Sequence, residues 1–419
     1  MLNLKEKILI TFPSLLISLI PFFLITGPFL SDLSVILVCI FFLLNITLNK
    51  EYSFLKNKFF FIFIIFFLYL FFNSVIKFYD INNIRSSLGY IRFGIFSLAV
   101  CYFIEKKLNL LKWVLLVFLF CFVLLIIDGY LQYFSKINIF GEPVDIRSMR
   151  IRFLLNDDYV LGSYLSRLFP IFFGLSLLFF KNSKNYMIGI CLLFIFIEVL
   201  IFLSGERVAF FFNTLAAIFI IIMIENFKKL RLLTLISSFI IIFFISAYDN
   251  TAKKRIWDQT IDQIGLKSQD SKLNIFSVVH QSHYTSAYKM YLDNKVFGIG
   301  IRNFRNFCSE ERYKTHDLSC STHPHNTYVQ LLSETGLIGF SFAFILFLYF
   351  VYKMFNHLKG TIFKKKYFFN DFQVCLLAAI LITIWPFAPS GNFFNNWISI
   401  IYYFPIGFFL WSLKKLRIQ

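Results

Sequence analysis

Long apolar stretches dominate this sequence and restrict what it can fold into. A helix that crosses a lipid bilayer needs about twenty consecutive, mainly apolar residues, and we count about twelve such stretches in the 419 residues. Their approximate limits are 8–26, 31–48, 58–76, 87–104, 111–134, 162–180, 186–204, 207–224, 231–248, 335–355, 373–389 and 393–413. The sequence therefore predicts an all-α, polytopic integral membrane protein with about twelve transmembrane helices.

The charge of the chain indicates how these helices are oriented. Charged residues make up only 15% of the chain, against about 25% in an average soluble protein, which excludes one ordinary water-soluble domain. The net charge of +18 would suggest a nucleic-acid partner in a soluble protein. Here Lys and Arg gather in alternate segments between the apolar stretches, as in cytoplasmic loops. We therefore expect no nucleic-acid partner, both termini in the cytoplasm, and anionic membrane lipids beside the basic helix ends.

Two long hydrophilic segments fall on the side opposite the termini, where we expect the functional groups. The predicted organisation is transmembrane helices 1–5 in residues 1–134, a loop at 135–161, helices 6–9 in 162–248, a large, partly helical loop at 249–334, and helices 10–12 in 335–419. Each of the two loops precedes a further set of membrane spans.

Cysteines are unevenly distributed between the spans and the larger loop. Five of the seven lie in apolar stretches, where Cys usually acts as a small packed hydrophobe. Cys308 and Cys320 share the larger loop. In an oxidising compartment they can form a disulfide, and from sequence alone free thiols are equally possible.

Five of the six His residues also lie in the larger loop: His280, His283, His316, His323 and His325. One interpretation is a zinc site with four ligands, supplied by His323 and His325 together with His280, His283 or a Cys. Their spacing matches no standard zinc pattern, and a single loop His often has no special role. No glycine-rich nucleotide-binding motif is present in the sequence.

Residues 322–339 are the most informative segment. Pro324 biases the preceding residue away from helical conformation, whereas the apolar spacing from Thr327 onward predicts a short helix. Gly336 can end this helix in a left-handed conformation. We therefore expect His325 at a helix start on the membrane surface, where the helix dipole would lower its pKa and keep it neutral, as a general base requires. The alternative is that His325 only helps to cap the helix.

This segment resembles the signature of the O-antigen ligase and polymerase family, in which His and Asn, Ser or Gln precede nine residues and two Gly. The matching residues are His325, Asn326, Gly336 and Gly339. Residues 204–207, Ser-Gly-Glu-Arg, are similar to the family's Ser- and Arg-containing segment, and residues 297–304 are similar to its Gly-x-Gly-x-x-Asn-Phe segment. The resemblance extends over roughly residues 128–340.

The resemblance implies a metal-independent, inverting glycosyltransferase without a cofactor, in the bacterial inner membrane, with a periplasmic active site. It would transfer an O-antigen or similar polysaccharide from undecaprenyl pyrophosphate to the lipid A-core. An O-antigen polymerase, which joins carrier-linked repeat units, and a protein O-oligosaccharyltransferase are alternatives, and we favour the ligase. A secondary transporter is the alternative outside the family, although it should show repeat symmetry and ionisable groups near the bilayer midplane.

Site residues carry over from the family motifs. His325 matches the catalytic His, and Arg207 matches an arginine that would stabilise the pyrophosphate leaving group, since a guanidinium binds phosphate oxygens bidentately. The family's second arginine falls near position 280, where this chain has no Arg. The candidates for its role are His280, His283, Arg302 and Arg305.

The smaller loop and the span after it hold further basic residues, namely Arg147, Arg150, Arg152 and Arg167. They can bind phosphate or core sugars, although the first three can equally be solvated loop residues. Arg167 and Glu198 both lie inside predicted spans, where ionisable groups are usually paired or functional. We expect these two to pair with each other or with Arg92.

Overall fold

The computed structural model describes residues 7–144, 150–155, 159–249, 253–264, 276–364 and 368–416. Across these ranges the protein is helical and contains no strand, apart from an isolated bridge between Ile137 and Pro143. The predicted all-α membrane architecture is confirmed.

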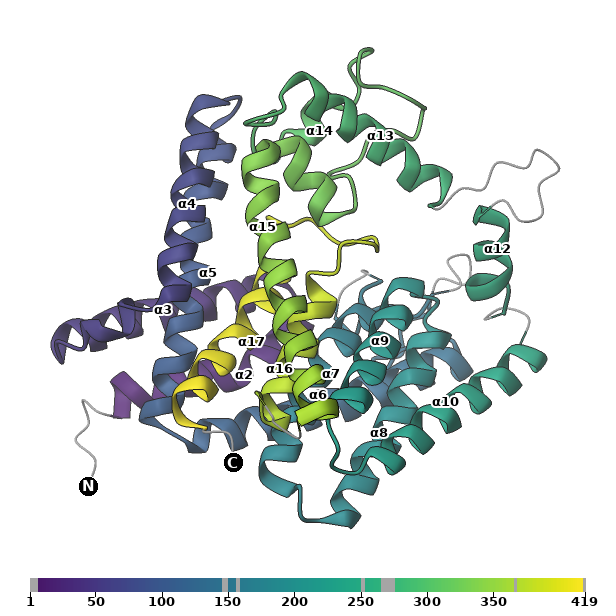
Figure 1. Ribbon diagram of the computed structural model, residues 1–419. Helices are drawn as coiled ribbons and strands as arrows, with labels where there is room; N and C mark the ends of the chain where they lie inside the picture. Colours follow the sequence, from purple (N-terminus) through teal and green to yellow (C-terminus); the bar gives the residue numbers. More distant parts are fainter. Residues whose placement is uncertain are drawn as a thin grey trace.

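The helices follow one another along the chain as Figure 1 shows. The first part comprises η1 (Lys7–Thr11), α2 (Phe12–Thr26), α3 (Pro28–Leu48), η2 (Tyr52–Leu55), α4 (Lys58–Ile76), α5 (Ile81–Lys106) and α6 (Asn109–Ser135). The middle part comprises α7 (Leu161–Phe180), α8 (Lys184–Leu203), α9 (Arg207–Met223) and α10 (Lys228–Tyr248). The large loop holds η3 (Lys254–Asp258), α12 (Gln259–Ile264), α13 (Val278–Asp293) and α14 (Phe304–Phe307). The last part comprises α15 (Thr327–Lys359), η4 (Gly360–Lys364), α16 (Asp371–Thr383) and α17 (Asn396–Lys415).

Ten helices in the described part of the chain are long and apolar enough to cross a membrane. The other two predicted stretches form α9 and α16, which are apolar but shorter. The 13 residues of α16 span only about 20 Å at about 1.5 Å per residue, less than the ~30 Å hydrocarbon core.

The predicted span 373–389 is therefore too long, since α16 ends at Thr383. Helical conformation is disfavoured for Trp385 because it precedes a proline, and Pro386 has no N–H to continue the helix. Residues 384–395, called the α16–α17 loop below, run without helix to the start of α17.

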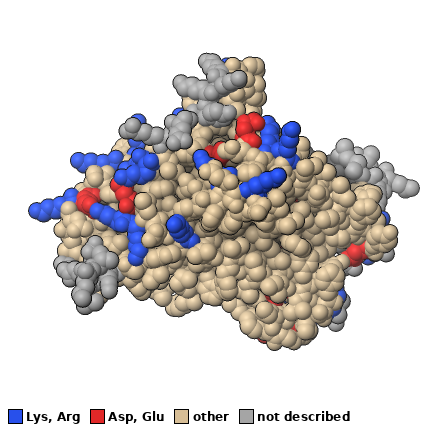
Figure 2. All heavy atoms as spheres, turned by 90° about the horizontal axis from the view of Figure 1, so that it is seen from below, with Lys and Arg blue, Asp and Glu red and all other residues tan. Residues whose placement is uncertain are grey.

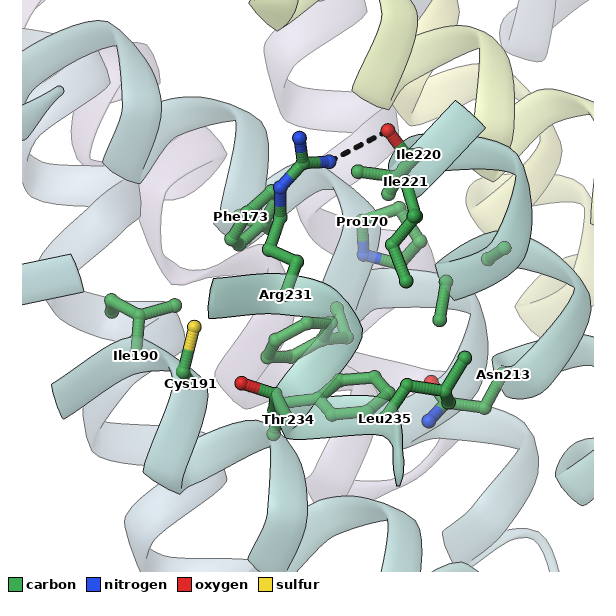
Figure 3. A pocket seen from close by; sticks show the side chains of 14 residues that line it. Pro170, Phe173, Ile190, Cys191, Asn213, Ile220, Ile221, Arg231, Thr234 and Leu235 are labelled. Carbon is green, nitrogen blue, oxygen red and sulfur yellow. Dashed lines mark hydrogen bonds between the residues drawn. The ribbon is translucent and has the colours of Figure 1, made fainter. Parts of the chain in front are cut away.

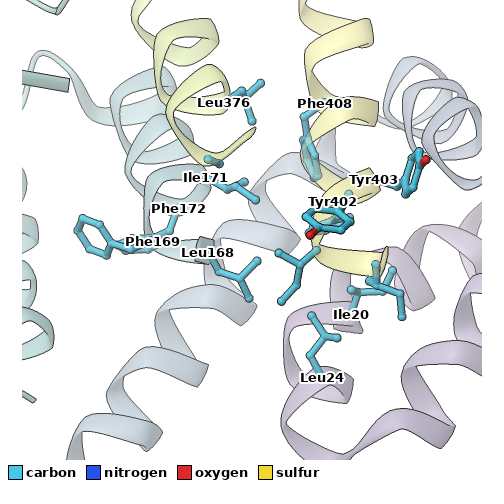
Figure 4. Packing of buried hydrophobic residues seen from close by; sticks show 14 of the residues in the cluster. Ile20, Leu24, Leu168, Phe169, Ile171, Phe172, Leu376, Tyr402, Tyr403 and Phe408 are labelled. Carbon is cyan, nitrogen blue, oxygen red and sulfur yellow. The ribbon is translucent and has the colours of Figure 1, made fainter. Parts of the chain in front are cut away.

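The core lies where α2, α7, α16 and α17 meet (Figure 4). Figure 4 shows some of the buried aromatic and branched side chains that these helices contribute to the core cluster. Within lipid, helices associate through close van der Waals packing, which favours small residues at contacts. A Cβ on Gly407 of α17 would lie 2.5 Å from Val100 Cβ of α5, and one on Gly174 of α7 would lie 2.8 Å from Cys375 Cβ of α16. These glycines allow the central helices to approach closely.

The two chain termini lie at one end of the bundle, and α13, α14 and the start of α15 lie at the other (Figure 1). Figure 2 looks onto the end that carries the termini, where Lys and Arg side chains outnumber Asp and Glu. We expect this basic end to face the cytoplasm. The candidate site residues described below would then face the opposite side.

Candidate active site

The start of α15 is set by a side-chain cap. Asn326 is the N-cap residue, and its Oδ1 accepts the backbone N–H groups of Tyr328 (2.9 Å) and Val329 (3.1 Å). Asn is a preferred cap because it satisfies donors that a helix start leaves open. His325 directly precedes the cap and has a left-handed φ of 55°. The helix start thus forms where the sequence predicts it, with Asn326 rather than His325 as the cap.

Four imidazoles gather at this helix start. His323 and His325 come from the segment before α15, and His280 and His283 come from α13. The ring centroid of His325 lies 4.1 Å from that of His323, 5.3 Å from that of His283 and 5.8 Å from that of His280. His316 is exposed and makes none of these ring contacts. We call the four residues the His cluster.

Three rings of the His cluster are hydrogen-bonded to neighbouring hydroxyl groups. His325 Nε2 lies 2.9 Å from Ser321 Oγ, His280 Nδ1 lies 2.8 Å from Ser277 Oγ, and His323 Nδ1 lies 2.9 Å from Thr322 Oγ1. A hydroxyl can donate to an imidazole nitrogen or accept from it. Both neutral tautomers of each ring are therefore compatible with these bonds.

The His cluster is held in the neutral state. Burial, followed by the charges of His323, His283 and His280, lowers the pKa of His325 to about 3. Burial likewise lowers the pKa of His323 to about 4. The lowered pKa has the direction predicted for His325, but its cause differs from the predicted helix dipole: desolvation and repulsion among neighbouring imidazoles disfavour the charged form.

The His cluster does not form a metal site. Within the described ranges, no three His, Cys, Asp or Glu residues are placed to hold a metal ion. The rings approach through ring contacts and hydroxyl hydrogen bonds instead. The zinc interpretation therefore has no support in this geometry.

A disulfide between Cys308 and Cys320 fixes the segment that leads to His325, with Cα atoms 5.1 Å apart. Cys308 directly follows α14. The same segment is bonded to α13, because Ser282 Oγ donates to Leu318 O (3.2 Å). These links hold the approach to α15 against the helix that carries the other two imidazoles.

Arg207 begins α9, after a turn in which Gly205 has φ 71°. Its Nη1 donates to Thr260 Oγ1 of α12 (3.1 Å). The charge of Arg207 is one of the causes that lower the pKa of His280. Arg207 therefore lies within electrostatic reach of the His cluster.

Glu206 supports the turn before Arg207, a role that the sequence motif alone did not reveal. Its two carboxylate oxygens accept the N–H groups of Gly162 (2.7 Å) and Ser163 (3.1 Å) at the start of α7, where open donors and the helix dipole favour a carboxylate. Burial raises the pKa of Glu206 to about 7, against these hydrogen bonds and the charges of Arg150 and Arg167. In the sequence, the sign of this role is an acidic residue at the end of an apolar stretch.

The predicted pairing of Arg167 with Glu198 or with Arg92 is wrong. Arg167 is buried, but it extends along α7 to donate to Ser163 Oγ, and its guanidinium lies over the ring of Phe212 (5.1 Å). The direction of the side chain, toward the outer end of its own helix, explains why it misses the other two.

Glu198 and Arg92 have other partners. Glu198 accepts hydrogen bonds from the side chains of Asn213 and Thr214 on α9. Arg92 forms an ion pair with Asp32 (2.9 Å). Both ionisable groups are thus satisfied within the helix bundle, away from Arg167.

The smaller loop contributes one arginine to the region of Arg207. Arg150 Nη2 donates to Tyr159 O (2.9 Å), and its charge acts on Glu206. Arg152 is fixed by its backbone, which exchanges two hydrogen bonds with the Gln132 side chain (3.0 and 3.1 Å). Arg147 lies outside the described residues.

Arg302 and Arg305 point to different surroundings. Arg302 Nη1 donates to Ser86 Oγ of α5 (2.8 Å). Arg305 is exposed on α14, and its charge contributes to the lowered pKa of His323. Of the four candidates for the second arginine's role, His280 and His283 make ring contacts with His325, Arg305 lies within electrostatic reach, and Arg302 is bound to α5.

The motif glycines shape a break in α15. Gly336 has φ 64° and ψ −167°, and a Cβ there would collide with Val296 O. The motif segment 297–304 caps the end of the first part of α15. Ile299 N–H donates to Ser333 O and Gly300 N–H donates to Glu334 O, both at 2.9 Å. As predicted, Gly336 ends the short helix in a left-handed conformation, and the membrane helix begins directly after it.

Gly339 allows α4 to approach the second segment of α15. A Cβ on Gly339 would collide with the Thr335 side chain and lie 3.3 Å from Tyr69 Cε1. Tyr69 in turn donates its hydroxyl to Thr335 O. Gly336 and Gly339 therefore position helices rather than contact a reacting group.

A separate apolar pocket lies among α7, α8, α9 and α10 (Figure 3). Arg231 lines one side of it and donates to Ile220 O and Ile224 O, both at 2.6 Å, at the end of α9. The lining contains no His, Asp or Glu. This pocket offers no imidazole or carboxylate for proton transfer, so the His cluster remains the candidate active site.

Part of the chain is similar to a known protein family. Residues 169–344 match the family model described as O-antigen ligase, and no curated protein matches the chain. The matched segment contains Arg207, α13 and the motif from His325 to Gly339, and it ends before the α16–α17 loop. Residues 169–344 are therefore similar to the O-antigen ligase family.

Proposed function

We propose that this protein is an O-antigen ligase that transfers a glycan from undecaprenyl pyrophosphate to the lipid A-core on the periplasmic face of the inner membrane. The match of residues 169–344 to the O-antigen ligase family supports glycosyl transfer between a lipid-linked glycan and an acceptor in general. The observation that carries the proposal is the lowered pKa of His325 at a helix start, in a cluster whose His280 lies within electrostatic reach of Arg207.

His325 acts in this proposal as the general base. A neutral imidazole can accept the proton of the acceptor hydroxyl as its oxygen attacks the anomeric carbon. Such proton transfer contributes about 10²- to 10⁴-fold to the rate. The attack forms the new glycosidic bond and breaks the bond between the anomeric carbon and the carrier pyrophosphate, with inversion at that carbon.

The donor itself would strengthen this base. With a pKa of about 3, His325 is a weak base, because efficient general bases have a pKa near the operating pH. A pyrophosphate brought beside the His cluster adds negative charge, which favours protonated imidazole and raises its pKa. Base strength would thus increase when the donor is bound.

Arg207 acts on the leaving group. Its guanidinium begins a membrane helix, the level at which the phosphates of a membrane-embedded carrier would lie, and it keeps its charge when partly buried. Arg150 adds positive charge nearby, and Glu206 holds the turn. We propose that His280 and His283 replace the second family arginine by donating hydrogen bonds to the phosphates.

Deletion of the gene followed by gel analysis of lipopolysaccharide tests the function. A ligase predicts loss of all long chains while carrier-linked polymer accumulates, and restoration by the intact chain but not by His325→Ala. His316→Ala is the matched control, since His316 lies in the same loop outside the His cluster. A core that carries one repeat would instead indicate a polymerase, and unchanged lipopolysaccharide with altered glycoproteins would indicate transfer to protein.

A further inference from the structure

The α16–α17 loop binds the start of α15 at three consecutive residues. Ser390 N–H donates to His325 O (2.9 Å), and Ser390 Oγ accepts the N–H of Thr327 (2.8 Å). Between them, the Asn326 side chain donates to Pro386 O (2.9 Å) and Ala388 O (3.2 Å). The loop lies outside the residues that match the family, and it covers the segment that presents His325.

The same loop also forms hydrogen bonds with side chains in the first turn of α15. Gln330 is buried; its Nε2 donates to Asn392 Oδ1 and its Oε1 accepts the N–H of Phe393, both at 2.9 Å. Tyr328 donates its hydroxyl to Ile384 O (2.7 Å). The loop is therefore bonded to α15 and the residues directly before it at several points between Ile384 and Phe393.

Ser390 makes two hydrogen bonds that stabilise this helix start. Asn326 caps the N–H groups of the second and third helical residues, and Ser390 Oγ accepts the N–H of the first, Thr327. His325 has a left-handed φ of 55°, which costs a non-glycine residue about 1–2 kcal/mol and persists only where surrounding contacts hold it. The bond from Ser390 N–H to His325 O is such a contact.

We infer that Ser390 is a positioning residue for His325 and that the α16–α17 loop fixes the orientation of the catalytic imidazole. Ser390 touches the main chain on both sides of the N-cap, not the reacting atoms. Its hydroxyl also lies 2.9 Å from Thr327 Oγ1, which lies 3.1 Å from Tyr402 OH of α17. These hydrogen bonds thus connect the backbone of His325 to the core of the bundle. The inference rests on the proposed role of His325 as the base.

The test compares Ser390→Ala and Ser390→Thr in the purified full-length protein. The substrates are an undecaprenyl-pyrophosphate-linked oligosaccharide and a lipid A-core acceptor. Ser390→Ala removes the hydroxyl that bonds to Thr327 and keeps the backbone bond to His325 O. A small displacement of a catalytic group can cost up to about a hundredfold in rate, so we expect the loss of the hydroxyl to lower kcat by about ten- to a hundredfold with donor KM unchanged. Ser390→Thr keeps the hydroxyl and should restore kcat to within about threefold. Ser412→Ala is the matched control, because Ser412 is buried on α17 and bonds only locally to Phe409 O.

The pH profile separates positioning from mere folding. His280 and His283 from α13 and His323 from the preceding segment surround His325 and keep it neutral. If Ser390→Ala releases the imidazole toward solvent, kcat should begin to fall at a higher pH than in the wild type, whereas a loss of folded protein would leave the profile unchanged.

Each outcome decides between the inference and the proposed function. Wild-type kcat in folded Ser390→Ala, together with an inactive His325→Ala, would overturn the inference and leave the proposed function intact. A lower yield of Ser390→Ala whose folded fraction has wild-type kcat and pH profile would also overturn it. An active His325→Ala would overturn the proposed function instead.

Discussion

Removal of the Cys308–Cys320 disulfide should loosen the segment that presents His325. The two residues are 12 positions apart, and closing a loop of that length removes chain entropy worth about 3 kcal/mol in the entropic model. Because each 1.4 kcal/mol corresponds to about a factor of ten, the segment should open about a hundredfold more often. We expect a lower melting temperature and a several-fold lower transfer rate.

The double substitution Cys308→Ser and Cys320→Ser, without a remaining loop thiol, is the variant to measure. Its thermal unfolding and transfer activity should match those of wild-type protein treated with reductant, and reductant should not affect the variant further. The other five cysteines are buried, so they serve as an internal control. Alkylation of both loop thiols in wild-type protein without prior reduction would refute the reasoning.

Three further predictions concern single residues. Arg207→Lys keeps the charge but loses the planar fork that binds phosphate bidentately, so kcat should fall at least about tenfold in the transfer assay, and an unchanged kcat would remove Arg207 from the site. Gly336→Ala should prevent accumulation of folded protein, because a Cβ there collides with Val296 O at φ 64°, whereas Gly189→Ala, with nothing within 4 Å, should accumulate normally. Burial holds the pKa of His325 at about 3, so the unfolded state binds a proton that the folded state does not, and stability should decrease as pH falls from about 6.5 toward 3. Glu206, with a pKa raised to about 7, has the opposite effect on stability between about pH 4.5 and 7. The difference in stability between wild type and His325→Gln therefore isolates the His contribution. Identical melting curves of the two proteins at every pH would contradict the prediction.

The membrane helices were predictable because hydropathy alone defines them. Every predicted apolar stretch corresponds to a helix, and the main error was at α16, where Pro386 ends the helix inside an otherwise apolar run. Apolar composition indicates the environment of a residue, whereas a proline indicates that the backbone cannot continue as a regular helix. Greater weight on Pro386 would have shortened that span and exposed the α16–α17 loop.

The candidate site was only partly predictable. The motif located His325 and Asn326, and the structure adds that His280 and His283 contact His325 from α13. Sequence spacing could not show which side chains meet across helices, and for this reason the expected pairing of Arg167 with Glu198 was wrong. The loop that binds the start of α15 lies about sixty residues further along the chain, so neither helical periodicity nor a local motif could reveal it.

The transfer rate of purified His325→Ala, measured beside His316→Ala, tests the central claim most directly. We expect His325→Ala to lose at least about a hundredfold in kcat, the contribution of general-base catalysis, while its folding and donor binding remain those of the wild type. His316→Ala should transfer glycan at the wild-type rate. A wild-type rate for His325→Ala would contradict the assignment of this imidazole as the base.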